Sequence, residues 1–208
     1  MKYRQAAASD AAAIASLHAD SWRRHYRGAY LDSYLDGDVL PDRRAEWAGR
    51  LSGPQAGLHT VVADLDGVVV GFAHVILDAD PAWGAYLDAL HVRHDLKRRG
   101  IGARLIAEAG RRVARRRPGA GLYLWVLEQN TAARAFYAGQ GGRCAGRELT
   151  GPLPGGGHAF SLRYAWPDPS VLARAAPAPS GGEGGAGRGG RGDPMIATDS
   201  PQALPEYR

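Results

Sequence analysis

The spacing of hydrophobic residues divides the chain into a helical beginning and a strand-rich middle. Behind the capping pair Ser9-Asp10, apolar side chains recur at helical spacing, namely Ala12, Ile14, Leu17 and Trp22. Pro41 opens a second short helix. Strand-like runs follow at 59–63 and 68–77, and Asp66-Gly67 between them is a strong hairpin signal. The pattern therefore predicts two helices followed by a β-hairpin.

The second half of the pattern alternates strands and helices. A third strand-like run over 86–92 leads to a helix that Gly100 opens, and Pro118-Gly119 ends that helix. The run 122–127 is apolar on both faces, as expected of a strand covered by helices on each side. A short helix over 131–138 and a closing antiparallel pair over 143–149 and 158–166 complete the order. This order predicts an α/β domain around one mixed sheet, in which the strands 86–92 and 122–127 pair in parallel through a right-handed crossover.

Composition sets the extent of this domain. The 208 residues are 45% hydrophobic, which suits one globular domain. From Pro167 onward Pro, Gly, Ala and Ser dominate, so we predict a domain over 1–166 and a disordered tail over 167–208. The lone Cys144 allows no internal disulfide, and no apolar run is long enough for a membrane span or a secretory signal. A cytoplasmic protein with no membrane partner is the expectation.

The positive charge is concentrated in one segment. The formal net charge is +5, yet residues 96–117 alone carry nine basic side chains against the single acid Glu108. Such a segment suits a polyanion, either a phosphorylated cofactor or a nucleic acid. The helix that begins here offers unpaired N–H groups, and Gly100 and Gly102 remove Cβ atoms where a pyrophosphate would lie. The spacing fits neither the P-loop nor the dinucleotide-binding fingerprint, and it favours a different pyrophosphate site.

Two motifs resemble one known family. The run Lys97-Arg98-Arg99-Gly100-Ile101-Gly102 resembles the signature Gln/Arg-x-x-Gly-x-Gly/Ala of the GNAT N-acetyltransferases, with lysine at its first position. Further along, Asn130, Ala133, Phe136-Tyr137 and Gly141 resemble the second hallmark of that family, with Gly142 where an aromatic residue is usual. The likeness covers about residues 3–166. It implies a single GNAT-type domain, with a mixed, mostly antiparallel sheet, helices on both faces, and a parallel strand pair splayed around the cofactor.

The resemblance implies a binding site for acetyl-coenzyme A. In such proteins the backbone of the strand matching 86–92 pairs with the pantetheine arm, as an added strand would, and the amides of the glycine loop hold the pyrophosphate. Carried over to this chain, the cofactor-binding residues are Leu90, Val92, Lys97, Arg98, Arg99, Gly100, Ile101, Gly102, Ala103, Asn130, Ala133 and Phe136. Asn130 has a simpler alternative role as the cap of the following helix.

The catalytic roles also follow from the resemblance. Tyr137 would protonate the leaving thiolate, and a strand N–H near Val92 would stabilise the oxyanion. Asp88 is the first candidate base and His91 the second, because imidazole titrates near neutrality. Each has a structural alternative: Tyr137 as a packed core ring, Asp88 as an acceptor for a backbone group, and His91 as a residue beside the cofactor. The acceptor pocket would use Trp22, Tyr26, Tyr30 and Trp125, which packing explains equally well.

The sequence thus predicts transfer of an acetyl group from acetyl-CoA to a primary amine. Direct transfer in a ternary complex is favoured over a covalent intermediate, because Cys144 lies outside the motifs. A small-molecule amine is the leading acceptor, and a protein or peptide amine comes second. The alternatives are a non-catalytic acyl-CoA-binding regulator and a nucleic-acid-binding module built on the basic helix. We expect no metal site and no nucleic-acid partner, and the resemblance allows a homodimer.

Overall fold

A computed structural model describes residues 1–153, 156–175 and 197–199. Its centre is one twisted sheet with the strand order β1-β2-β3-β4-β5-β7-β6. All neighbours are antiparallel except β4 and β5, which are parallel. The strands are β1 (Lys2–Gln5), β2 (Leu58–Leu65), β3 (Val68–Asp80), β4 (Gly84–Val92), β5 (Leu122–Leu127), β6 (Arg143–Thr150) and β7 (Ala159–Trp166), and β8 (Ala197–Asp199) pairs with β4 outside this order.

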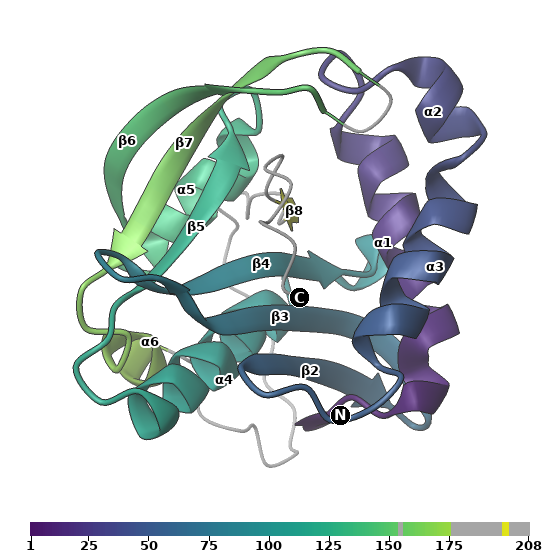
Figure 1. Ribbon diagram of the computed structural model, residues 1–208. Helices are drawn as coiled ribbons and strands as arrows, with labels where there is room; N and C mark the ends of the chain where they lie inside the picture. The colour runs from purple at the N-terminus through teal and green to yellow at the C-terminus, as the bar shows by residue number, and fades with distance from the viewer. Residues whose placement is uncertain (154–155, 176–196, 200–208) are drawn as a thin grey trace, which may run out of the picture.

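Helices cover the two faces of this sheet (Figure 1). One face carries α1 (Ala11–His25) and α3 (Val39–Arg50), with α2 (Asp32–Asp36) between them in the chain. The opposite face carries α4 (Ile101–Arg116), α5 (Thr131–Gly139) and α6 (Val171–Ala175). Short 3-10 turns, η1 (Ala8–Asp10) and η2 (His94–Leu96), precede α1 and α4. None of the helices within the described residues is long and apolar enough to span a membrane.

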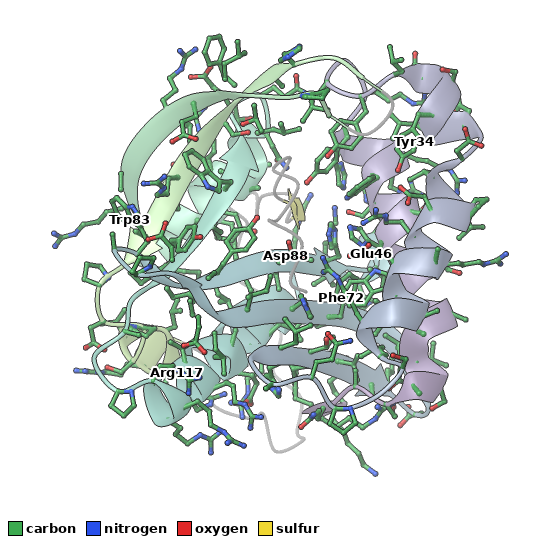
Figure 2. All side chains as sticks on the ribbon, in the orientation of Figure 1. Tyr34, Glu46, Phe72, Trp83, Asp88 and Arg117 are labelled. Carbon is green, nitrogen blue, oxygen red and sulfur yellow. The ribbon has the colours of Figure 1, made fainter. Side chains whose placement is uncertain are left out.

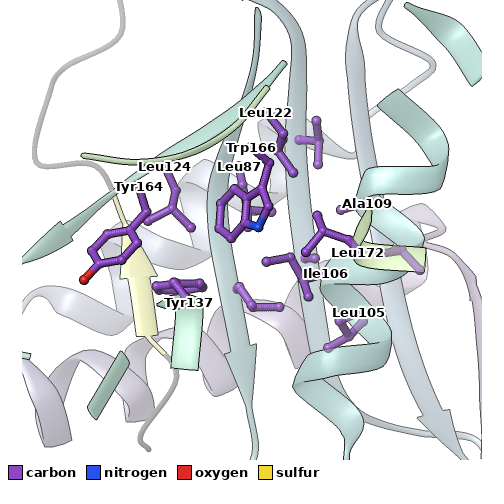
Figure 3. Packing of buried hydrophobic residues seen from close by; sticks show 14 of the residues in the cluster. Leu87, Leu105, Ile106, Ala109, Leu122, Leu124, Tyr137, Tyr164, Trp166 and Leu172 are labelled. Atoms are coloured by element: carbon purple, nitrogen blue, oxygen red, sulfur yellow. The ribbon is translucent and has the colours of Figure 1, made fainter. Parts of the chain in front are cut away.

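The largest hydrophobic cluster lies between the sheet and α4 (Figure 3). The buried stripe of α4 includes Leu105, Ile106 and Ala109, and α4 packs on β2, β3 and β4. Trp166 at the end of β7 and Tyr137 of α5 extend the same cluster. Full burial of a large apolar side chain stabilises the fold by about 1.5–3 kcal/mol. The cluster contains residues of β2, β3, β4, β5 and β7, so its packing holds these strands together.

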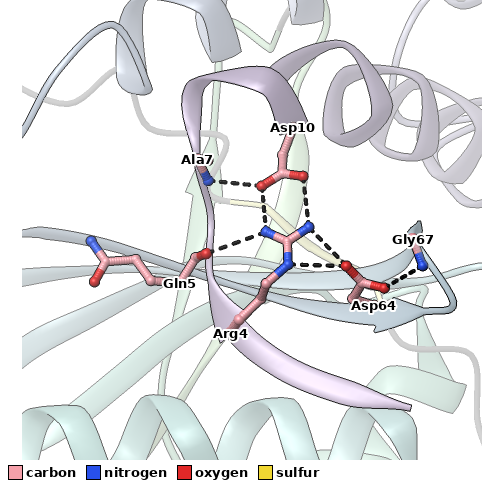
Figure 4. A network of polar contacts seen from close by, with 6 residues as sticks. All are labelled: Arg4, Gln5, Ala7, Asp10, Asp64 and Gly67. Carbon is pink, nitrogen blue, oxygen red and sulfur yellow. Dashed lines mark hydrogen bonds and ion pairs between the residues drawn. The ribbon is translucent and has the colours of Figure 1, made fainter.

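A polar network ties the N-terminus to the hairpin (Figure 4). The guanidinium of Arg4 contacts Asp10 at 2.7 Å and Asp64 at 2.9 Å. The same carboxylates accept the backbone N–H groups of Ala7 and Gly67, both at 2.7 Å. The network therefore joins β1, the start of α1 and the turn between β2 and β3. The sequence pattern missed β1 because this strand is only four residues long and its partners lie far along the chain.

Strand β4 carries a β-bulge just beyond the last residue that pairs with β5. His74 lies opposite Ala89 and Val75 lies opposite Leu87, so Asp88 is an extra residue on β4. Strand β4 pairs with β5 only at Ala85–Leu122 and Tyr86–Tyr123. Beyond Tyr86 the two strands diverge, and the edge of β4 from the bulge to Val92 is left without β5 as a partner. This confirms the predicted splayed pair.

The remaining expectations about the fold are mostly confirmed. The Asp66-Gly67 hairpin, the right order of strands and helices, and the antiparallel closing pair β6–β7 are all present. The folded chain continues past the predicted boundary at Trp166, because α6 packs against α4 and buries Leu172 completely. At the contact, a Cβ atom on Gly110 would lie 2.6 Å from the carbonyl oxygen of Pro169. The predicted disorder of 176–196 and 200–208 lies outside the described residues.

Candidate functional site

A loop of unpaired backbone N–H groups precedes α4. Two of its residues have left-handed backbone conformations, Arg98 with φ of 64° and Gly100, the N-cap of α4, with φ of 74°. Within the part of the chain that the structure describes, no acceptor takes the N–H groups of residues 98–103. Together with the positive end of the α4 dipole, these groups form a cradle for an anion.

A cleft of about 100 Å³ lies against this cradle. Its lining contains most of the residues predicted to bind the cofactor, namely Val92, Lys97, Arg98, Gly100, Ile101, Gly102, Ala103 and Phe136. Arg99 is exposed and does not line the cleft. Sequence reasoning missed Leu96 and Gln140, although Gln140 follows Phe136 by four residues and so lies near the same face of α5. The buried Oε1 of Gln140 has no hydrogen-bond partner among the described residues, which suits a polar ligand in the cleft.

The C-terminal end of α1 supports the loop from the other side. The ammonium Nζ of Lys97 lies 3.0 Å from Nε2 of His25. Burial, with the charge of Lys97 acting in the same direction, lowers the pKa of His25 to about 4, so the imidazole is neutral and accepts this hydrogen bond. Burial also lowers the pKa of Lys97, with the charge of Arg24 acting in the same direction. His25 thus orients the lysine at the first position of the motif, a role that the sequence did not indicate.

Asn130 and Ala133 build the start of α5. The side chain of Asn130 accepts the N–H of Ala133 at 3.1 Å, and Asn130 is almost fully buried. The capping role considered from the sequence is therefore present. Its predicted contact with the cofactor stays a prediction.

Tyr137 lies on α5 in the main hydrophobic cluster (Figure 3). It is fully buried, and its ring centroid lies 5.2 Å from that of Phe136 and 6.1 Å from those of Tyr164 and Trp166. This packing fixes the ring, so the position of the phenol is set by the core. The structure thus contains the packed ring of the simpler alternative, and proton donation stays a prediction.

Asp88 takes part in a buried ion pair on the opposite face of the sheet. Its carboxylate accepts a hydrogen bond from Nη1 of Arg50, whose Nε lies 2.5 Å from Glu46. Figure 2 shows Glu46 and Asp88 on the two sides of the junction between α3 and β4. Burial, the largest single influence, would raise the pKa of Asp88, but the charge and hydrogen bond of Arg50 together with the charges of His74 and Arg43 outweigh it, and the pKa is lowered. Asp88 is therefore ionised and bound to a guanidinium, which weakens it as a base.

His91 belongs to a row of buried histidines between α1 and the sheet. Its Nδ1 lies 2.8 Å from Oγ of Ser21, and its ring lies 4.5 Å from that of His18. The indole of Trp47 donates to Nδ1 of His18 at 2.9 Å. His74 lies 2.7 Å from the hydroxyl of Thr60. The hydrogen bonds among these contacts join residues 14 to 70 positions apart, so no local sequence pattern could have revealed them.

The predicted acceptor residues form two separate groups. Trp22, Tyr26 and Tyr30 share one cluster, with ring centroids 4.9–5.6 Å apart and the guanidinium of Arg43 4.4 Å from the ring of Trp22. Trp125 lies on β5 in another cluster, where the guanidinium of Arg163 is 4.5 Å from its ring. The structure therefore brings three of the four together. His, Cys, Asp and Glu residues in the described ranges form no cluster of three that could hold a metal ion.

Comparisons with known proteins agree on the family. A model of the acetyltransferase (GNAT) family matches residues 15–141. A probable N-acetyltransferase of Mycobacterium tuberculosis, Rv2775, is 31% identical over 157 residues, covering 74% of this chain and 87% of that protein. The chain therefore belongs to the GNAT family, the acetyl-CoA-dependent N-acyltransferases.

Solved structures share the fold. The PaiA N-acetyltransferase from Thermoplasma acidophilum, in complex with coenzyme A, has a TM-score of 0.63 and 19% identity, and the match covers 79% of this chain and 98% of that one. The putative acetyltransferase YncA from Salmonella typhimurium, with acetyl-CoA, has a TM-score of 0.59 and 19% identity, covering 80% and 92%.

Proposed function

We propose that this protein transfers the acetyl group of acetyl-CoA directly to the primary amine of a small molecule. The observation that carries the proposal is the cradle of unpaired N–H groups at 98–103, which lies beside the splayed edge of β4. When bound, acetyl-CoA supplies the acetyl group as a thioester. The N–H groups of the cradle bind the pyrophosphate, and the backbone of Leu90 and Val92 pairs with the pantetheine amides.

The proposed proton transfers use two faces of the sheet. Tyr137 donates a proton to the leaving thiolate from the α5 side. His91 and Asp88 are the acceptors for the proton that the substrate amine loses, and the ion pair with Arg50 makes Asp88 the weaker one. Cys144 is exposed on β6, and this position supports transfer without a covalent intermediate on the protein.

The proposed acceptor side is the aromatic cluster of α1 and the turn after it. Trp22, Tyr26 and Tyr30 pack on one another as a buried aromatic cluster, and an acceptor bound against this cluster would be an amine carried on a compact organic group. A panel of small amines and short peptides, assayed by released thiol, tests this choice. If only the peptides are acetylated, the acceptor is a peptide amine and not a small molecule.

Cofactor binding is tested by calorimetric titration of acetyl-CoA into three proteins. Ala103 is half-buried in the first turn of α4 and lines the cleft, so Ala103→Asp places a negative charge beside the proposed pyrophosphate without disfavouring the helix. Ala103→Asn is the matched control of equal size. We expect the aspartate variant to bind at least about tenfold more weakly than the asparagine variant, since repulsion at short range exceeds about 1.4 kcal/mol. Equal affinities of the two variants would show that the pyrophosphate does not bind in this cleft.

The proton donor is tested by Tyr137→Phe, with Tyr164→Phe as its control in the same cluster. The phenylalanine keeps the buried ring, so folding and acetyl-CoA affinity should persist. We expect kcat to fall by about 10²- to 10⁴-fold for Tyr137→Phe and by little for the control. Unchanged turnover would return Tyr137 to the role of a packed core ring.

A further inference from the structure

A segment near the C-terminus of the chain lies on the edge of β4 that the proposed cofactor requires. Strand β8 pairs antiparallel with β4, with Ala197 opposite His91, Thr198 opposite Leu90 and Asp199 opposite Ala89. Figure 1 shows β8 in the gap between β4 and β5, and β8 also contacts β5 and α1. The added strand therefore lies where the divergence of β4 and β5 opens the sheet.

One strand edge can serve one partner at a time. The backbone N–H and C=O groups on this side of β4 are the groups that an extended ligand would use. The pairing with β5 ends at Tyr86, before the bulge at Asp88, so Ala89–His91 is the stretch that is open to an added strand. Strand β8 and the pantetheine arm of the proposed function need the same stretch, and Leu90 is common to both.

The segment that contains β8 can compete for the edge of β4, but it has no side chain that could accept the acetyl group. Residues 176–208 contain no lysine, so they carry no side-chain primary amine to receive an acetyl group. Because β8 belongs to the same chain, its effective concentration at the β4 edge is on the order of millimolar. A contact of only three residue pairs can therefore compete with a ligand in solution.

We propose that β8 is an internal inhibitor, a strand of the chain's own C-terminal region that occupies the pantetheine subsite on β4 and leaves when acetyl-CoA binds. This inference rests on the proposed function. The apparent affinity for acetyl-CoA is then the intrinsic affinity multiplied by the fraction of molecules in which the edge is open. Because the two partners exclude each other, acetyl-CoA in turn reduces the fraction of molecules in which β8 is docked.

The test uses full-length chains with substitutions within β8. Adjacent residues of a strand direct their N–H groups to opposite sides, so Thr198→Pro with Asp199→Pro removes whichever N–H faces β4. Thr198→Ala with Asp199→Ala, which keeps both N–H groups, is the matched control. Calorimetry should show acetyl-CoA binding at least about threefold tighter to the proline variant than to the wild-type chain or the alanine control.

Hydrogen exchange provides a second measurement on the wild-type chain. The amides of 197–199 should exchange faster when acetyl-CoA is added, because the strand is displaced. Equal affinities in all three chains, with exchange at 197–199 unchanged by acetyl-CoA, would overturn the inhibitory role and leave the proposed function intact. Absence of binding to every chain, the proline variant included, would overturn the proposed function and this inference with it. Binding to the proline variant alone would support strong inhibition.

Discussion

The loop before α4 and the polar cluster between α1, α3 and β4 differ in how their hydrogen-bonding groups are used. The loop presents backbone N–H groups that no other part of the described chain takes up. In the cluster, buried polar side chains are engaged by partners from distant segments, as in the pairs Arg50–Asp88, Ser21–His91 and Trp47–His18. One region keeps its hydrogen-bonding capacity for a ligand, while the other uses much of it to hold helices on the sheet.

This difference has an energetic consequence. An unpaired N–H at a helix start is tolerated where water or a ligand can reach it. A polar group deep between helix and sheet is tolerated only with its partner, because a partner lost there leaves a desolvated donor, acceptor or charge. Substitutions in the loop should therefore change affinity with little effect on stability, and substitutions in the cluster should change stability first.

The largest expected effect comes from breaking the ion pair of Asp88. The side chains of Arg50 and Asp88 are only 16% and 10% exposed. Asp88→Asn would leave the guanidinium buried with Glu46 as its remaining carboxylate, and we expect the free energy of unfolding to fall by about 3 kcal/mol. Urea unfolding followed by circular dichroism measures the change.

The matched control is Asp78→Asn at the other end of the sheet. Asp78 pairs with Arg117 at 2.5 Å, but both side chains are about half exposed. Water screens such a pair, so the loss should be below about 1 kcal/mol. Similar losses for the two variants would mean that burial does not distinguish the cluster, and the contrast between the regions would fail.

The same contrast explains what the sequence could predict. The cradle depends on neighbours in the chain, namely a strand end, Gly100 and the first turn of a helix, so its residues were found from spacing and family likeness. The hairpin at Asp66-Gly67 is local in the same way, since both residues have positive φ angles of 52° and 88°.

What the sequence could not predict depends on tertiary contact. The ion pair of Asp88 joins residues 38 positions apart, and the contact of His91 with Ser21 joins residues 70 positions apart. Strands β1 and β8 have four and three residues, too few for a hydrophobic period to be recognised. Helix α6 lies where composition predicted a tail, because Leu172 finds a site against Gly110 that only the folded α4 provides.

An intermediate effect is expected from acid. Burial, with the charge of Arg50 acting in the same direction, lowers the pKa of His74 to about 3. An unfolded histidine titrates near 6.5, so between about pH 6.5 and 3 the unfolded chain binds the proton that the folded chain excludes. The free energy of unfolding must then fall as pH is lowered through this window, by about 2 to 3 kcal/mol at pH 4.5 for this residue.

Burial together with nearby positive charges lowers the pKa values of His25 and His59 to about 4, and both residues act with the same sign. Urea unfolding at pH 7.0 and 4.5 should therefore show a loss that shrinks by about 2 kcal/mol in His74→Gln. Glutamine offers the hydroxyl of Thr60 a hydrogen bond and cannot titrate. An identical loss in both proteins would place the acid sensitivity elsewhere.

The smallest expected effect concerns a residue to which both a structural task and a ligand-binding task are assigned. Asn130 caps α5, a structural task, and is also predicted to bind the cofactor. Asn130→Ala removes both roles, whereas Asn130→Ser keeps a capping oxygen on a shorter side chain. We expect only the alanine variant to lose stability, by about 1 kcal/mol. Both variants should bind acetyl-CoA about fivefold more weakly, the loss of one hydrogen bond. If the serine variant binds acetyl-CoA as the wild type does, Asn130 serves the fold alone, and acetyl-CoA is bound through backbone groups instead of this side chain.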